Sequence, residues 1–513
     1  MGIFHKIYLY AFILSAFFLK EGLHAQGNIL ELLPGTEKVI FDQKTGQHRL
    51  IGTVNFTYQG NTMYCDSAHY HHNKKIVHAY GNVQIKKDDI NLFCDSLLYY
   101  GATKYAKLWG NVRIRDLEYK IATDSIDYNA KNGRATYRNY GKIESIVSNE
   151  MVTSKYGYFY PNIGSFFFSG KVLYKKEDLI MTTDTLQFAY EKQLTQFFGP
   201  TEIKNDSVTI NCERGSFHVQ KEEGTLYKNV KISQSGQVVV CDTAYYASKP
   251  QIFTARGKVQ IDDNQNNQRL LSDVFYSNQS IGKSYITGNA LAIQKTENDS
   301  IYLLSDTLTI LEDSIGNTKA MMGNKNVKIY SNGMQSISDS AYYDNKTGQL
   351  TLSKSPIIWA KNAQLKGDTI VVFMMDSLVK KAIVSGKASA IMELDSGLYY
   401  NQLSGRKMTA WFDNNELQRA DMNGNAWTIL YPIEELKTDS SITKKRLGLN
   451  RLYASDLRVF LDSGEVKSIT YFDKPDGVFY PMNQIKEEEK FIVGFNWLVS
   501  KRPKRPKNIG RKI

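Results

Sequence analysis

Proline is scarce in this sequence, and apolar runs long enough to cross a membrane are missing from it. The 513 residues include 10 prolines and four cysteines. The cysteines form no CxxC pair and no Cys/His cluster with metal-ligand spacing. The motifs GxxxxGK[ST], HExxH and GxSxG are absent as well. These absences argue against a P-loop enzyme, a zinc protease and a serine hydrolase. We therefore expect no enzymatic activity and no cofactor.

Residue types that favour β-strands are abundant. Tyr (33) outnumbers Phe (24), and many of the 36 glycines recur at regular intervals. No long amphipathic helical pattern is present. This composition predicts an all-β protein with short turns.

A short motif recurs along most of the chain. Its clearest copy is Cys94-Asp95-Ser96-Leu97-Leu98-Tyr99, which is followed by Gly110-Asn111-Val112. A worn copy lies near Lys155, and Glu213 takes the place of the acid in another. A period of about 29 residues is typical of a stacked repeat architecture with two or three strands per repeat. The motif acids, of which the first three are 29 residues apart, are Asp66, Asp95, Asp124, Asp184, Asp242, Asp306 and Asp339.

Apolar residues keep fixed places relative to the motif acid. Positions two before, two after and four after the acid are apolar in nearly every copy, as Phe93, Leu97 and Tyr99 illustrate. Side chains alternate along a strand, so these positions predict one apolar column. Pairs such as Val83 and Ile85 predict a second column.

If side chains alternate strictly along the strand, the motif acid points to the same face as the apolar residues. A buried unpaired carboxylate on that face would be costly. A bend or bulge at the Asp-Ser/Thr pair would release it. We therefore interpret these acids as a structural corner. The alternative is a stacked metal site, against which Glu213 and Lys155 stand in equivalent places and no companion ligand recurs.

The four cysteines all precede the acid of a motif copy. Cys65 and Cys94 are 29 residues apart, as are Cys212 and Cys241. Neighbouring rungs would bring each pair close enough for a disulfide, but small buried thiols are the preferred interpretation. His69, His71, His72 and His78 could ligate a metal, although other copies carry Leu and Tyr there, so no metal site is predicted.

The two ends of the chain differ from the repeats. Lys6, the apolar stretch 7–19 and Leu23-His24-Ala25 predict an export signal over residues 1–25, with an uncleaved anchor as the alternative. The net charge is +12, and seven of the last 13 residues are Lys or Arg. We expect residues 491–513 to form a solvated basic tail, or one that contacts acidic lipid or a partner. Nucleic acid is not expected as a partner.

The repeated pattern of Gly-x-Val, an apolar strand and [Cys/Thr/Ser]-Asp-[Ser/Thr]-apolar-x-Tyr/Phe resembles the OstA/LptA family of periplasmic lipopolysaccharide-transport proteins. It is most similar to the long OstA-like proteins of the Bacteroidetes type. The resemblance covers about residues 30–430. It implies a β-jellyroll or bent half-pipe over residues 26–430, in one array or two consecutive OstA-like units, with terminal strands and loops at 431–490.

The resemblance further implies a periplasmic protein, with or without outer-membrane association. Its interior would hold the acyl chains of lipopolysaccharide or a related glycolipid. Other transport proteins, or further copies of the chain, would dock edge to edge. Two alternatives remain: a closed β-helix that binds or cleaves polysaccharide, and a purely structural surface solenoid. The candidate lipid-groove residues are Tyr64, Tyr70, Val83, Ile85, Phe93, Leu97, Tyr99, Val112, Ile114, Ile126, Tyr128, Val172, Leu186, Phe188, Val240, Tyr246, Val259, Ile261, Leu308 and Tyr343.

Overall fold

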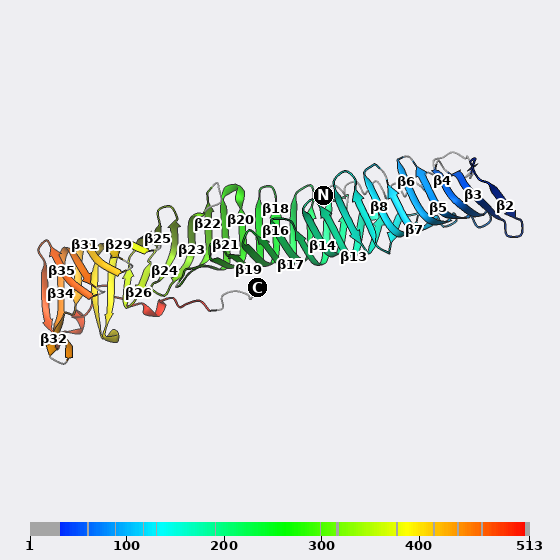
Figure 1. The fold of residues 1–513 in the computed structure, drawn as a ribbon. Coiled ribbons are helices and arrows are strands. Elements are labelled where there is room, and N and C mark those ends of the chain that lie inside the picture. Colours follow the sequence, from blue (N-terminus) through cyan, green and yellow to red (C-terminus); the bar gives the residue numbers. More distant parts are fainter. Residues whose placement is uncertain are drawn as a thin grey trace. The chain divides into compact units, whose positions relative to one another are not determined.

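A computed structural model describes most of the chain after residue 30 (Figure 1). It forms two compact units, of which unit 1 ends at Lys249 and unit 2 begins at Pro250. The predicted export signal lies outside the described residues. No helix within the described ranges has the length and apolar character of a membrane span. These ranges are 31–58, 61–87, 89–115, 117–129, 131–189, 191–297, 299–313, 318–375, 378–413, 416–438, 441–462 and 465–507.

Unit 1 is built from antiparallel strands, most of them about 11 residues long, joined by short turns. Strands that follow one another in the sequence lie side by side, as β3 to β8 and β13 to β18 do (Figure 1). The strands are β1 Glu31–Leu32, β2 Lys38–Asp42, β3 Gln47–Tyr58, β4 Asn61–His71, β5 Ile76–Lys87, β6 Ile90–Tyr100, β7 Tyr105–Arg115, β8 Tyr119–Asn129, β9 Arg134–Tyr137, β10 Gly141–Ser145, β11 Glu150–Ser154, β12 Tyr156–Tyr160, β13 Ser165–Lys176, β14 Leu179–Ala189, β15 Leu194–Lys204, β16 Val208–His218, β17 Glu223–Gln234 and β18 Gln237–Ala247.

Each long strand bends in its middle, at a bulge. In the pairing of β5 with β6, Gly81 and Asn82 lie opposite the single residue Asp95. Both bulge residues have positive φ, 69° at Gly81 and 45° at Asn82. Glycine adopts such a backbone without steric cost, and asparagine tolerates it better than most residues. The Gly-Asn pair therefore marks the corner of a strand, and the strand has one arm on each side of it.

Unit 2 continues the antiparallel pattern with longer strands towards its end. β32 and β33 form a separate two-stranded hairpin. The strands are β19 Ile252–Asp263, β20 Gln268–Asn278, β21 Lys283–Lys295, β22 Ser300–Glu312, β23 Thr318–Tyr330, β24 Gln335–Asp344, β25 Gln349–Ser353, β26 Ile357–Ala360, β27 Ala363–Lys366, β28 Thr369–Met375, β29 Leu378–Leu394, β30 Tyr399–Asp413, β31 Glu416–Leu430, β32 Ile433–Thr438, β33 Ser441–Arg446, β34 Gly448–Asp462, β35 Glu465–Phe472 and β36 Asp476–Pro481.

Helical structure within the described residues is limited to short 3-10 turns. Residues from both arms of the unit 2 strands, such as Ile358 and Ile370, pack into one apolar cluster. We call the face that carries this cluster, and its equivalent in unit 1, the inner face. The 3-10 turns are Pro161–Ile163, Gln279–Ile281, Asp395–Gly397, Met482–Gln484, Glu487–Glu489 and Val499–Lys501.

The all-β repeat array predicted from the sequence is confirmed, with two strands in each repeat. In each repeat the glycine of the Gly-x-Val pattern lies at the bend within one long strand, as Gly110 does in β7. The alternative of a closed β-helix is wrong, because the strand pairings described for both units are antiparallel.

Candidate functional site

The inner face of each unit carries the apolar residues of the columns that the sequence predicted. In β6 the buried side chains are Ile90, Leu92 and Cys94 before the corner and Leu97 after it. The second predicted column is also buried, with Val83 0% exposed. Of the candidate groove residues, the structure buries Val83, Ile85, Leu97, Val112, Ile114, Ile126, Tyr128, Val172, Leu186, Phe188, Val259, Ile261 and Leu308.

Three candidates lie on the outer face instead. Tyr64 and Phe93 are 39% and 41% exposed, and Val240 is half-buried. The prediction was wrong because it counted strict alternation through the corner. The bulge shifts the parity at the acid, so Cys94 rather than Phe93 shares the inner face with Leu97. The predicted bulge was correct, but its effect on the preceding arm was missed.

The remaining candidates point to the inner face but are less covered. Tyr70, Tyr99 and Tyr343 are half-buried, and Tyr246 is 48% exposed. All four stand four residues after the acid, near the open end of the second arm. They are the inner-face aromatics most accessible from outside.

Aromatic side chains fill the inner face in the middle of unit 1. Phe159 and Phe166 lie 4.6 Å apart between ring centroids, and Phe168 and Phe188 are almost fully buried. Tyr137 donates or accepts a 2.6 Å hydrogen bond with the Ser154 hydroxyl. This stretch is packed like an ordinary protein core.

Towards the end of unit 1 the inner face is less covered. Gly215 and Gly224 occupy inner-face places, and the Phe197 ring fills the space beside Gly215. Phe217 and Leu226 are half-buried beside them, and Tyr246 is the most exposed of the inner aromatics. Unit 1 therefore has a filled stretch and a more open stretch along one apolar face.

The motif acids form a ladder on the outside of the corners, as predicted. Asn82 donates a 2.9 Å hydrogen bond to Asp66, and Asn111 donates one of 3.0 Å to Asp95. A Cβ added at Gly110 would come within 2.3 Å of the Asp95 carboxylate. The glycine is thus required both by its φ of 74° and by the acid packed above it.

The ladder also contains departures from the motif, and one corner acid, Asp273, that the sequence analysis missed. Glu213 accepts from Asn229, and Lys155 takes the corner place beside Gly170. Asp273 and Asp456 bond to Asn289 and Asn423 as further corner acids. The spacing of 16 residues from acid to asparagine, as between Asp66 and Asn82, was a usable signal. Of the other predicted corner acids, Asp124, Asp184, Asp242 and Asp306 are exposed and Asp339 pairs with Lys354.

The four cysteines are buried free thiols. Cys65 lies on β4 and Cys94 on β6, so β5 separates them. Two strand spacings amount to roughly 10 Å, beyond the Cα separation that a disulfide accepts. Burial raises the pKa of both thiols to about 12. The disulfide alternative fails because each repeat contributes two strands rather than one.

The histidines near one another form an aromatic patch on the outer face. His78 contacts the Tyr80 hydroxyl and packs on Trp109, and His69 lies 5.3 Å from the Tyr80 ring. Burial lowers the pKa of His69 and His78. In the part of the chain that the structure describes, no group of His, Cys, Asp or Glu has the geometry of a metal site.

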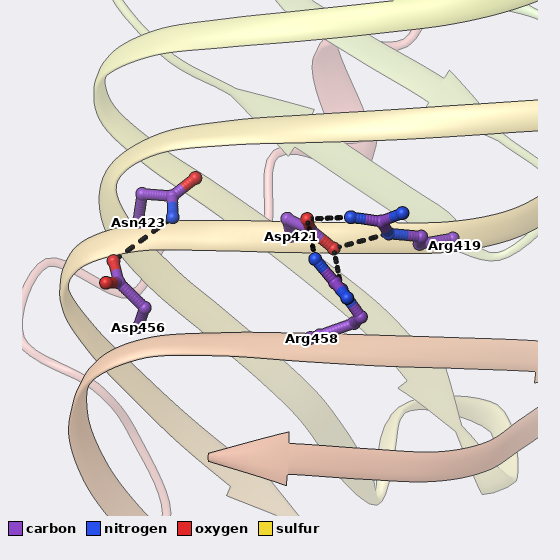
Figure 2. A network of polar contacts seen from close by, with 5 residues as sticks. All are labelled: Arg419, Asp421, Asn423, Asp456 and Arg458. Carbon is purple, nitrogen blue, oxygen red and sulfur yellow. Dashed lines mark hydrogen bonds and ion pairs between the residues drawn. The ribbon is translucent and has the colours of Figure 1, made fainter. Parts of the chain in front are cut away.

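An ion-pair cluster lies on the outer face of unit 2 (Figure 2). Arg458 on β34 donates hydrogen bonds of 2.9 and 3.0 Å to both oxygens of Asp421 on β31. Arg419 binds the same carboxylate and stacks 4.3 Å above Trp411. Burial pushes the pKa of Asp421 upward, but both arginines outweigh it and lower the pKa to about 2.

The first strands of unit 1 leave apolar side chains uncovered. β1 and β2 both pair with β3, and no further strand among the described residues pairs with them. Leu32, Val39 and Phe41 are 42%, 50% and 55% exposed. Val39 lies opposite the buried Leu50, so it extends the inner face to this edge.

The same region is similar to a known family. Residues 31–184 match the model of the OstA-like proteins. The resemblance inferred from the repeated motif is thereby confirmed for this OstA-like region, which runs from β1 to the corner acid Asp184 of β14. It contains the exposed edge at β1 and β2 and most of the aromatic filling.

Two further comparisons were made. No curated protein matched the chain. A crystal structure of LptH from Pseudomonas aeruginosa is similar, at 17% identity and a TM-score of 0.19, over 21% of this chain and 75% of that one. That protein is described as the LptA-homologous periplasmic component of the conserved lipopolysaccharide transport device.

Proposed function

We propose that the chain is a non-enzymatic periplasmic protein that binds lipopolysaccharide or a related glycolipid and takes part in its transport to the outer membrane. The observation that carries this proposal is the continuous apolar inner face within an OstA-like region. Acyl chains would occupy that face and leave the polar head group outside. Burial contributes roughly 0.8 kcal/mol for each CH₂ group removed from water.

The filled stretch of unit 1 must make room for a lipid. The two arms of each strand are joined at the corner. Acyl chains would enter between the arms and displace contacts among Phe159, Phe166 and Phe188. The half-buried tyrosines at the open end of the second arm, such as Tyr99, would meet the lipid first.

Partners would dock at the exposed edge. β1 and β2 offer backbone groups for an added strand, and Val39 and Phe41 offer apolar surface in continuity with the inner face. Addition of a strand from another transport protein, or from a second copy, would extend the face without a break.

A pair of photo-crosslinker positions on one strand tests the proposal. Benzoylphenylalanine at Tyr99 lies on the inner face of β6, and at Phe93 it lies on the outer face of the same strand. After irradiation of cells, Tyr99→benzoylphenylalanine should give a lipopolysaccharide adduct and the Phe93 variant should not. Silence at Tyr99 in a folded, exported protein would contradict a lipid conduit and favour a purely structural solenoid. An adduct with polysaccharide lacking acyl chains would favour polysaccharide binding instead.

A further inference from the structure

The C-terminal segment, residues 486–507, runs back across the strands of unit 2 on their outer face (red in Figure 1). It passes β30, then β27, then β24 and finally β22, because its residues bond to one side chain on each of these strands. The sequence analysis expected a solvated tail from residue 491, and this is wrong for residues 491–507. The segment lies on the side of the sheet opposite the inner face.

One column of the repeat changes its chemistry where the segment lies. Four residues before the corner position stand Gln335, Gln364 and Gln402 in three successive copies. They are 4%, 1% and 0% exposed. The same place in the other described copies holds Thr62, Asn91, Lys120, Met151, Ile180, Thr209, Val238, Arg269, Tyr302 and Leu452. A buried amide is costly unless its donors and acceptor are satisfied, so three in a row mark a built site.

Two of the glutamines bind the backbone of the segment at two points each. Gln402 donates to the Lys490 carbonyl at 2.8 Å and accepts from the Ile492 N–H at 3.0 Å. Gln364 does the same six residues later, with the Asn496 carbonyl and the Leu498 N–H, both at 2.8 Å. A side-chain amide carries the donor and acceptor of a peptide group, so each contact imitates a strand pairing. Such contacts recognise the peptide backbone rather than a particular side chain.

Side-chain pockets accompany these backbone contacts. Ile492 is 4% exposed and packs against Ile429, Tyr431 and Leu449. Phe495 and Trp497 lie 5.2 and 5.6 Å from the Tyr400 ring. These contacts favour a segment that carries apolar and aromatic residues at its beginning.

The far part of the segment is held by arginines. Arg502 donates to Gln335 at 2.6 Å and to the Lys361 carbonyl at 2.8 Å. Arg505 donates to the Tyr302 hydroxyl at 3.1 Å. The indole of Trp359, which is 0% exposed, donates to the Gln364 oxygen at 3.2 Å and fixes the orientation of that amide.

We propose that the outer face of unit 2 is a peptide-binding site, and that the C-terminal segment is its exchangeable resident ligand rather than an integral part of the fold. Its ligand class is a peptide in which an aromatic and aliphatic stretch, as at residues 491–499, precedes arginines, as at Arg502 and Arg505. The glutamine column reads the backbone at two points six residues apart. The site is independent of the proposed lipid function, because it uses the opposite face of the sheet.

A cleavable full-length chain tests this directly. A site-specific protease sequence inserted between Gln484 and Ile485 would release the covalent link while leaving every residue in place. We expect the fragment to co-elute with the body after cleavage, and an excess of labelled synthetic peptide 486–507 to replace it, as followed by fluorescence anisotropy. Immediate loss of the fragment, or failure of the peptide to exchange while the body stays folded, would overturn the proposal.

Substitutions in the glutamine column measure how much these contacts contribute to the affinity for the peptide. Gln364→Leu and Gln402→Leu each remove two hydrogen bonds and should weaken peptide binding roughly ten- to hundredfold. Asn91→Leu makes a similar amide-to-leucine change at the same repeat position in unit 1, where the segment does not lie, and should leave binding unchanged. Equal affinities for all three variants would refute backbone reading by the glutamines.

Modifying the peptide instead of the protein tests the same hydrogen bonds without affecting the folding of the protein. N-methylation at Ile492 and Leu498 removes the two N–H donors that the glutamines accept. We expect a similar loss of affinity, whereas N-methylation at Val493, whose side chain is 84% exposed, should have a much smaller effect. The opposite order would show that the peptide is held by its side chains alone.

Discussion

The two units use the same bent strand but fill and cover it differently. The inner face of unit 1 carries fully or almost fully buried aromatic residues in its middle, such as Phe168 and Phe188. In unit 2 the corresponding cluster is rich in alanine, valine and methionine, as at Ala382 and Ala410. The outer face of unit 2 is crossed by residues 486–507 of the chain itself. The repeat therefore determines to which face each side chain points. The residue types in a column determine how that face is packed or covered.

The largest difference in stability between the two units is expected when inner-face aromatic side chains are truncated. Phe188 is 0% exposed, so Phe188→Ala should cost about 3–5 kcal/mol through lost burial and the cavity left behind. Tyr343 takes the equivalent place in unit 2 but is only half-buried, and Tyr343→Ala should cost about 1 kcal/mol. Urea unfolding followed by intrinsic fluorescence measures both. Equal losses would mean that the inner faces are packed alike.

The second largest difference in stability between the units is expected for substitutions of the corner glycines. Gly110 and Gly424 have similar φ values, 74° and 77°. An added Cβ would meet the Asp95 carboxylate at 2.3 Å in the first case and the flexible Arg406 side chain at 2.9 Å in the second. Gly110→Ala should cost about 2–3 kcal/mol and Gly424→Ala about 1 kcal/mol.

Hydrogen exchange of the flanking strands reports these two losses locally. Gly333→Ala is the control, because a Cβ there meets nothing within 4 Å, and it should be close to neutral. If Gly424→Ala were as damaging as Gly110→Ala, strain at positive φ alone would explain the corner glycines.

The ion-pair cluster gives unit 2 a pH dependence that should be smaller. The pKa of Asp421 is lowered to about 2 in the folded chain from an ordinary value of 3.8. Its contribution is therefore complete above about pH 4 and is lost as the pH falls towards 2. The cluster lies at the surface, so we expect about 1 kcal/mol. Asp421→Asn should remove this step from urea midpoints measured between pH 2 and 6, and an unchanged profile would contradict the assignment.

The smallest effect on stability is expected from exchanging one small side chain for another on the inner face. Thr123 and Thr183 stand where other copies carry cysteine, and each donates to a backbone carbonyl, at 2.8 and 3.2 Å. Cys94→Thr should therefore change the stability by less than about 1 kcal/mol. Because burial raises the pKa of the Cys94 thiol to about 12, the native thiol should also resist alkylation at pH 8. Rapid alkylation of the folded protein would mean that the inner face opens readily.

Sequence reasoning succeeded where a feature repeats. The strands, the corner acids and the column of Val83 and Ile85 were predictable because many copies report the same environment. The parity before the corner was not, since alternation was carried through a bulge that shifts it by one residue. The residue that the bulge turns inward is Cys94.

The C-terminal contacts were out of reach for a different reason. They join residues as far apart as Tyr302 and Arg505, and no local pattern encodes such a pairing. The run of Gln335, Gln364 and Gln402 at one repeat position was visible in the sequence, but its meaning depends on knowing that this column points outward.

The alternation of strand direction has a consequence for how such a chain can change its length. A repeat of about 29 residues contributes two strands, one out and one back, and adds roughly 10 Å along the stacking direction. An in-frame duplication of one repeat restores the direction of every later strand, whereas a gain or loss of a single strand would reverse them all. The length of such an array should therefore change by duplication or loss of whole repeats in the gene, in steps of two strands.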